Sequence, residues 1–433
     1  MRSTALGQVR RAAAAAPERG FGFVAALAGR GLMSFHPFRA LSPRVSAGLI
    51  ALLMGALCAD ASASAVSNFL VTNNDVPEPN PPQNYKGSTA TFYTLGLEGN
   101  LSDKTVVLTG GDGIAGGFFA ASRVAIVPLA NDVCVFVSNA ASNNIAGISG
   151  TTRTLTGDYS ASADDEGGAN GIGLAANASY LYASFSTSST IATFEIGAGC
   201  TLSFVSDLST VGLSAGRVNG MALNGAMLVA TYGDGSIASF NISSGAPTSN
   251  GDAQYSTGAA EDHLPNGVVI TSDGRFAIFG DASTVSTIEV SAISSGKLTS
   301  TVAYDLGTAW NSGNVGLSPD NSLIYVTNNS GGEVSAAFFD TATGGVSGGC
   351  TTAPLKGFYE SWAYAGGAVL QPSTAHGGFF YVPEFGGNGF SSLGVVRLYV
   401  QGGNCTLTEL SSSPIVDNTD AASLLSIAAY IGG

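Results

Sequence analysis

A segment of about 48 residues recurs along the chain, and its best-defined copy is NVGLSPDNSLIYVTNNSGGEVSAAFFDTATGG at 314–345. Runs of β-branched and aromatic residues, each of strand length, alternate there with turns rich in Gly, Asn, Asp and Pro. No segment between the turns has the 3.6-residue spacing of an amphipathic helix. The segment therefore predicts one four-stranded antiparallel unit.

The second strand of this unit aligns with five similar runs, and successive copies begin 47 to 56 residues apart. The six runs are VCVFVSN at 133, YLYASFS at 180, MLVATYG at 227, FAIFGDA at 276, LIYVTNN at 323 and FFYVPEF at 379. Because one such unit cannot bury both of its faces alone, a regular repeat of four-stranded units predicts a β-propeller.

The two ends of the repeat region complement each other. The segment SNFLVTNND at 67–75 is another copy of the second strand, but it has no innermost strand before it. The segment ASLLSIAAYIGG at 422–433 is a lone apolar strand. We expect this C-terminal strand to complete the N-terminal blade, which closes a ring of seven four-stranded antiparallel blades and leaves no open sheet edge.

The sequence Tyr325-Val326-Thr327-Asn328, which follows Ser318-Pro319-Asp320, resembles the YVTN-repeat, lactonase-like seven-bladed propellers. That family includes 6-phosphogluconolactonase-like and carboxymuconate-cyclase-like proteins. Leu70-Val71-Thr72-Asn73 is a near match to the same motif. The resemblance implies the propeller fold and favours an activity on a lactone or a related sugar acid.

Residues 1–65 have the features of a leader with a secretory signal peptide. Arg39 and Arg44 precede an apolar run near 45–57, and small residues suited to signal peptidase end at Ala63 and Ala65. The apolar run is too short for a stable membrane span. We expect the true start at Met33, cleavage near Ala63 or Ala65, a single β-propeller domain over 66–433, and a secreted or periplasmic protein.

The charge of residues 66–433 limits the partners of the predicted domain. This segment contains nine Lys and Arg against 28 Asp and Glu, a net formal charge of −19. Such a surface repels nucleic acid phosphates and anionic lipid, so we expect no nucleic acid partner. We also expect no stable membrane span after cleavage of the signal peptide, and a monomer.

The predicted domain has four cysteines, an even number that permits two disulfides in an exported chain. They are Cys134, Cys200, Cys350 and Cys405. Strand order places all four at the end of the ring opposite the predicted site, and their pairing stays open.

Polar residues recur where each innermost strand is expected to begin, about ten residues before the second strand. They are Arg123, Asn170, Asn219, Asn266 and Asn314. In one interpretation Asn and Gly here only shape turns and fit a crowded axis. In the other, the side chains bind a ligand at one mouth of the central channel.

The loops at the same mouth supply candidate chemical groups. Asp262 and Glu384, together with Asn266, form a candidate Ca²⁺ site, because calcium prefers oxygen ligands. Asn side chains beside carboxylates are similar to the calcium-binding mouths of gluconolactonase-like propellers. His263 and Glu360 are the candidate acid/base residues, and Trp362 could stack on a ring-shaped ligand.

These features favour an exported hydrolase or isomerase that acts on a lactone or sugar acid at the channel mouth. The alternative is a non-catalytic secreted propeller that binds a protein, a glycan or a cell-surface partner through the same loops.

Overall fold

The second strands predicted from the repeat are buried along almost their whole length, which is why they read as continuous apolar runs. In the computed structural model, all seven residues of β5 (Val133–Asn139) and all six residues of β13 (Met227–Tyr232) are buried. The outermost strand β7 (Thr154–Ser160) instead alternates between exposed and half-buried positions. Strands near the axis are covered by neighbours on both faces, whereas the rim meets water.

The structure describes residues 66–74, 87–114, 122–162, 164–167, 171–210, 217–252, 254–255, 264–281, 288–305, 312–328, 333–351, 369–371, 378–384, 395–401, 406–416 and 424–432. They belong to one compact unit, Ala63–Gly433. The predicted signal peptide, the start at Met33 and the cleavage site lie outside the described residues, as does Cys405. Within them, no helix is long and apolar enough to cross a membrane.

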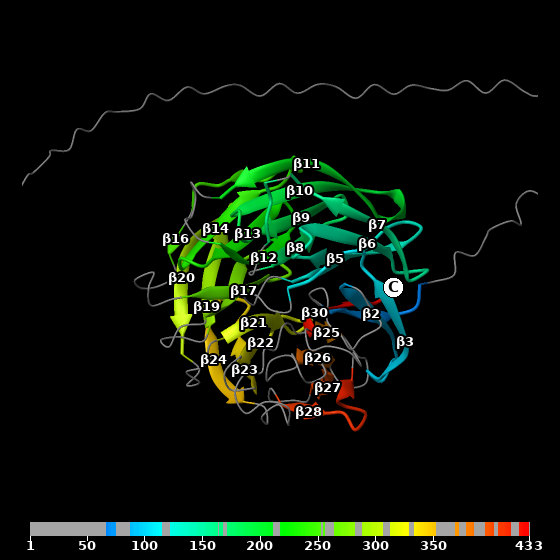
Figure 1. Cartoon of the computed structure of the whole chain (residues 1–433). Helices are drawn as coiled ribbons and strands as arrows, with labels where there is room; N and C mark the ends of the chain where they lie inside the picture. Colours follow the sequence, from blue (N-terminus) through cyan, green and yellow to red (C-terminus); the bar gives the residue numbers. More distant parts are fainter. Residues whose placement is uncertain are drawn as a thin grey trace, which may run out of the picture. The chain divides into compact units, whose positions relative to one another are not determined.

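The strands form seven antiparallel sheets in a ring, here called blades 1 to 7 (Figure 1). From the axis outward, blade 1 contains β30 (Leu424–Tyr430), β1 (Phe69–Asn74), β2 (Thr89–Leu95) and β3 (Leu101–Leu108). Blade 2 contains β4 (Val124–Pro128), β5, β6 (Asn144–Ser149) and β7. Blade 3 contains β8 (Ile172–Ala176), β9 (Tyr180–Phe185), β10 (Thr190–Gly197) and β11 (Thr201–Ser209), with a 3-10 turn at Ala198–Cys200.

The remaining blades follow the same order. Blade 4 contains β12 (Val218–Asn224), β13, β14 (Ser236–Asn241), β15 (Thr248–Ser249) and β16 (Gln254–Tyr255). Blade 5 contains β17 (Pro265–Ile270), β18 (Phe276–Asp281), β19 (Ile288–Ser294) and β20 (Lys297–Tyr304). Blade 6 contains β21 (Ser312–Leu317), β22 (Leu323–Asn328), β23 (Glu333–Phe339) and β24 (Val346–Thr351). Blade 7 contains β25 (Val369–Gln371), β26 (Phe379–Glu384), β27 (Val395–Gln401), β28 (Leu407–Glu409) and β29 (Ile415–Val416).

The predicted closure of the ring is confirmed. Strand β30 pairs with β1 in antiparallel register, from Phe69 opposite Tyr430 to Asn74 opposite Leu424. Strand β30 thus supplies the innermost strand of the first blade and covers the inner edge of β1.

The apolar core lies between the blades. The described residues form seven apolar clusters, and each cluster combines side chains from two neighbouring blades. The cluster around Leu70, Tyr93 and Tyr381 joins blade 7 to blade 1. Since every blade is packed on both faces, burial of apolar surface supports the ring as a whole.

In two blades the fourth strand is interrupted. In blade 4, β15 and β16 both pair with β14, and between them the Asp252 carboxylate accepts hydrogen bonds from Ser239 N at 3.0 Å and Leu298 N at 2.7 Å. In blade 7, β28 and β29 both pair with β27, and Ser413 Oγ accepts one from Leu398 N at 3.1 Å. In both places a side chain replaces the backbone acceptor of the missing strand segment.

Candidate functional site

The mouth of the channel is the end of the ring at which the innermost strands begin. Four of the predicted ligand-binding residues are described, and each lies at the start of an innermost strand: Arg123 before β4, Asn219 in β12, Asn266 in β17 and Asn314 in β21. All four are buried, with exposed fractions of 2 to 8%. The repeat therefore placed these positions correctly, and whether they bind a ligand stays a prediction.

Neighbouring asparagines bond to one another across the blades. Asn219 Nδ2 donates to Asn266 Oδ1 at 3.4 Å and to the Pro265 carbonyl at 3.2 Å. Thr231 Oγ1 donates to the Asn266 carbonyl at 2.5 Å. These bonds tie the start of blade 4 to the start of blade 5, so the amides have a structural use at this position.

Small residues let the innermost strands approach closely. A β-carbon on Gly220 would lie 2.4 Å from the Asn266 carbonyl oxygen, and one on Gly267 would lie 2.5 Å from Asn314 Oδ1. No larger residue fits these contacts without moving a neighbouring strand. This is the physical meaning of the Asn-Gly pairs in the repeat.

Arg123 brings a buried positive charge to the mouth. A β-carbon on Gly171 would lie 2.6 Å from Nη2 of Arg123, so the guanidinium lies against the backbone that leads into β8. Gly171 has φ +86°, a conformation that glycine adopts without cost. Burial lowers the pKa of Arg123 to about 10, which leaves the group cationic at neutral pH.

Arg123 is also tied to the strand that closes the ring. Its backbone N donates to Ser426 Oγ of β30 at 2.9 Å, and Ser426 N donates to Asn73 Oδ1 of β1 at 2.8 Å. These contacts fix the start of β4 against blade 1.

Arg217 is a second basic residue at the mouth, and sequence reasoning missed it. It directly precedes β12, as Arg123 precedes β4, and its Nε donates to Asn219 Oδ1 at 3.1 Å. Burial lowers its pKa. The signal was available, because both arginines are followed by valine at the same point of the repeat.

Two buried acids of blade 5 were also missed. Asp281 ends β18 and Glu289 lies near the start of β19, both at the mouth end of the sheet, and both side chains are fully buried. Asp281 Oδ1 accepts a hydrogen bond from Leu264 N at 3.0 Å. Asp281 stands where other copies of the repeat have Asn, which was the available signal.

Several predicted site residues lie outside the described part of the chain: His263, Glu360, Asn170, Trp362 and Asp262. Glu384 ends β26, but its side chain is not among those described. The acid/base, stacking and calcium predictions that depend on these residues stay predictions.

Within the described ranges, no three His, Cys, Asp or Glu side chains gather closely enough to hold a metal ion. Asn266 Oδ1, the candidate calcium ligand, accepts a hydrogen bond from Asn219 Nδ2.

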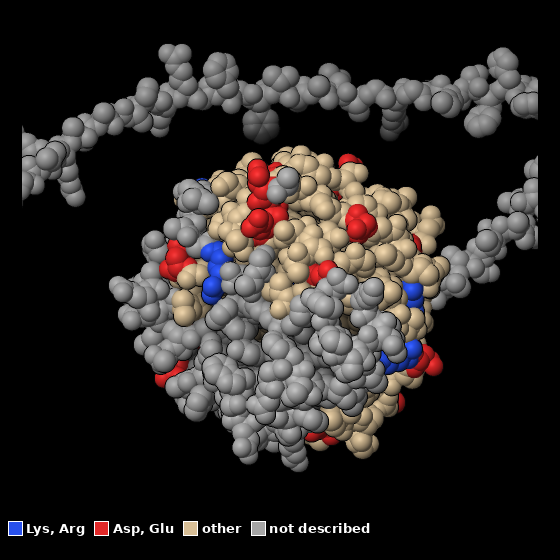
Figure 2. Space-filling view, viewed as in Figure 1, with Lys and Arg blue, Asp and Glu red and all other residues tan. Residues whose placement is uncertain are grey.

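Asp165 lies in the segment between β7 and β8 and bonds both to that segment and to β10. Asp165 Oδ2 accepts from Ser162 N at 3.2 Å, and its Oδ1 accepts from the Thr190 hydroxyl. Figure 2 shows Asp and Glu gathered over the region of β9 to β11, whereas Lys and Arg form small separate patches.

The cysteines show one disulfide among the described residues. Cys134 at the start of β5 is bonded to Cys200 before β11, with 5.1 Å between their Cα atoms. The bond joins blade 2 to blade 3 at the end of the ring opposite the mouth, where strand order placed the cysteines.

No family model matches the chain. No curated protein matches it either. Solved structures share its fold at low sequence identity. One, from Bacteroides fragilis and provisionally assigned as a 6-phosphogluconolactonase, has 16% identity and a TM-score of 0.57 over 84% of this chain and 98% of its own. The periplasmic gluconolactonase PpgL of Pseudomonas aeruginosa has 13% identity and a TM-score of 0.58, over 84% and 99%. The chain thus has the fold of the lactonase-like seven-bladed propellers, as the sequence predicted.

Proposed function

We propose that the protein is a lactonase-like enzyme that hydrolyses or isomerises an anionic lactone or sugar acid at the mouth of the channel. The observation that carries the proposal is the placement of Arg123 and Arg217 directly before innermost strands of blades 2 and 4. Residues 66–433 contain only nine basic residues, so two at equivalent positions of one mouth favour an anionic ligand.

The guanidinium groups bind the carboxylate or phosphate of the substrate in this proposal. Both groups remain cationic at neutral pH, and a partly buried guanidinium binds an oxyanion more strongly than an exposed one. The amides of Asn219 and Asn266 hold the innermost strands in register beneath them.

The reaction we propose is addition of water to the lactone carbonyl, followed by cleavage of the ring C–O bond and protonation of the leaving oxygen. His263 and Glu360 remain the proposed proton carriers, and Asp281 is a further candidate, since it is buried at the same end of blade 5. We also propose export to the periplasm or the medium through the leader in residues 1–65.

The test is steady-state hydrolysis of glucono-1,5-lactone and its 6-phosphate by the wild type and by Arg123→Met, Arg217→Met and Arg275→Met. Arg275 is the control, because it is paired on the surface with Asp273 at 2.6 Å. We expect Arg123→Met and Arg217→Met to lower kcat/KM for the phosphorylated lactone at least tenfold, mainly through KM, with a smaller effect on the neutral lactone. Arg123→Lys should restore part of the loss.

A wild type inert toward both lactones would exclude this proposal and leave the non-catalytic binding protein. If Arg123→Met and Arg217→Met hydrolysed the phosphorylated lactone as well as the control Arg275→Met, the assigned role of the two arginines would be excluded. Melting temperatures of the variants identify any loss that comes from unfolding of the buried Arg123 site.

A further inference from the structure

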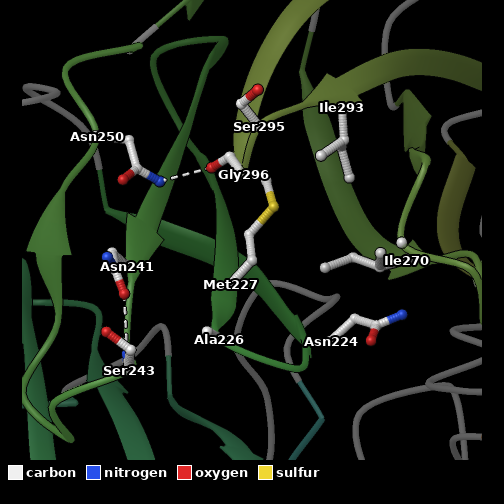
Figure 3. A pocket seen from close by; sticks show the side chains of 11 residues that line it. Asn224, Ala226, Met227, Asn241, Ser243, Asn250, Ile270, Ile293, Ser295 and Gly296 are labelled. Carbon is white, nitrogen blue, oxygen red and sulfur yellow. Dashed lines mark hydrogen bonds between the residues drawn. The ribbon is translucent and has the colours of Figure 1, made fainter. Parts of the chain in front are cut away.

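A pocket of about 350 Å³ opens between blades 4 and 5, at the end of the ring opposite the proposed active site. Blade 4 contributes Asn224, Met227 and Asn250, and blade 5 contributes Ile270, Ile293 and Gly296. In Figure 3, Asn250 and its bond to Gly296 lie on one side, Asn224 and Ile270 on the other, and Met227 between them. Its volume is within the range of small-molecule sites.

At four other blade interfaces the corresponding space is filled by an aromatic ring. The first residue of the second strand is aromatic and lies against a glycine in the turn between the third and fourth strands of the next blade. The four pairs are Phe69 with Gly150, Tyr180 with Gly245, Phe276 with Gly344 and Phe379 with Gly99. A β-carbon on any of these glycines would lie 2.4 to 2.9 Å from the ring.

The interface between blades 4 and 5 keeps the glycine but lacks the ring. Met227 occupies the first position of β13, and a β-carbon on Gly296 would have no atom within 4 Å. The cavity that Phe276 and Gly344 line at the next interface is only about 80 Å³. At this interface no ring of the chain lies against the glycine, and the cavity is correspondingly larger.

The pocket walls specify the chemistry of an occupant. Met227, Ile270 and Ile293 give an apolar surface, and none of the lining residues carries a charge. Asn224 Nδ2 donates to the Thr271 carbonyl at 2.7 Å, and Asn250 Nδ2 donates to the Gly296 carbonyl at 2.8 Å. Since both amide nitrogens donate to protein oxygens, the Oδ1 atoms remain as the acceptors of these two side chains.

We propose that this pocket binds a neutral small molecule with a planar aromatic ring that carries hydroxyl or amide donors. The ring lies on Gly296, where four other interfaces have a Phe or Tyr ring, and the donors bond the amide oxygens of Asn224 and Asn250. The thioether of Met227 contacts the ring, as methionine sulfur does at aromatic edges elsewhere. This inference is independent of the activity proposed at the mouth.

The probe is 4-hydroxybenzamide, added to the full chain and followed by ligand-observed NMR and by the shift in melting temperature. We expect saturable binding at one site. Cyclohexanecarboxamide keeps the amide but has a puckered ring, and we expect it to bind at least tenfold more weakly.

Two variants block the pocket in different ways. Met227→Phe supplies the missing ring, and Ser243→Trp covers the pocket from an exposed turn. Both should reduce binding at least tenfold, and the second reports on the pocket if the first does not fold. The reciprocal variant Phe276→Met removes the ring that covers Gly344 and should add a second site for the probe.

Failure of the probe to bind the wild type at 10 mM would overturn the proposal. So would unchanged affinity in a folded blocking variant, or equal affinity for the planar and the puckered ring.

Discussion

The carboxyl groups of Asp165 and Asp207 lie side by side at the outer part of blade 3. Asp165 is 3% exposed, whereas Asp207 lies at an exposed position of β11. Burial raises the pKa of Asp207 to about 6, and the charge of Asp165 raises it further in the same direction. Asp207 therefore keeps its proton over a pH range in which it would be ionised in the unfolded chain.

This pair predicts a pH dependence of stability. Because the folded pKa of Asp207 is above the unfolded value, its contribution is complete below about pH 4 and is lost as the pH rises through about 6. Asp207→Asn mimics the protonated acid, so it should raise the melting temperature at pH 7.5 and change it little at pH 4. Thermal melts of both proteins from pH 4 to 8 provide the measurement, with Glu195→Gln on neighbouring β10 as the control. Parallel pH profiles for wild type and Asp207→Asn would contradict the pairing.

At the residue scale, the sequence predicted where the mouth residues lie in the strands better than it predicted which residues they bond. Arg123, Asn219, Asn266 and Asn314 were found because a strand repeat fixes where each innermost strand begins. The bond from Asn219 to Asn266 could not be predicted, because it depends on the distance between blades 4 and 5 rather than on spacing along the chain. Arg217 was within reach of the repeat and was overlooked.

The Cys134–Cys200 disulfide acts at the scale of the element, because it joins the second strand of blade 2 to the turn before β11 of blade 3. The cysteines are 66 residues apart, so the bond closes a long loop in the unfolded chain. The double variant Cys134→Ala/Cys200→Ala should lose about 2–4 kcal/mol of unfolding free energy. Urea unfolding of the variant should match that of wild type in reducing agent, and a midpoint equal to oxidised wild type would contradict the prediction.

The second strands were the most predictable elements and the outer strands the least. β22 and β26 begin at Leu323 and Phe379, where the repeat placed them, since an unbroken apolar run is needed when both faces are buried. The interruptions of the outer strands depend on side-chain bonds of Asp252 and Ser413, which no hydrophobic pattern records. The outer strands are polar and partly exposed, so their sequences show little hydrophobic periodicity.

At the scale of the whole molecule, the ring depends on one strand contributed from the far end of the chain. β30 pairs along all of β1, and Ile427 joins the cluster between blades 7 and 1. Ser426 links Asn73 of blade 1 to the start of blade 2 through two hydrogen bonds. Loss of this strand therefore exposes the edge of β1 and removes contacts with two neighbouring blades at once.

A chain truncated after residue 423 should consequently lose the closure while it keeps the other six blades. We expect a melting temperature lower by 10 °C or more and rapid proteolysis near β1, because stacked blades stabilise one another and an open edge does not. A synthetic peptide of residues 424–433 added in trans should restore part of the stability, whereas the same peptide with Ser426→Pro should not, since proline cannot donate to Asn73 Oδ1. The measurement is the melting temperature of the truncated chain with and without each peptide. A truncated chain that melts like the full chain would mean that the ring does not depend on this strand for its stability. Equal rescue by both peptides would mean the same.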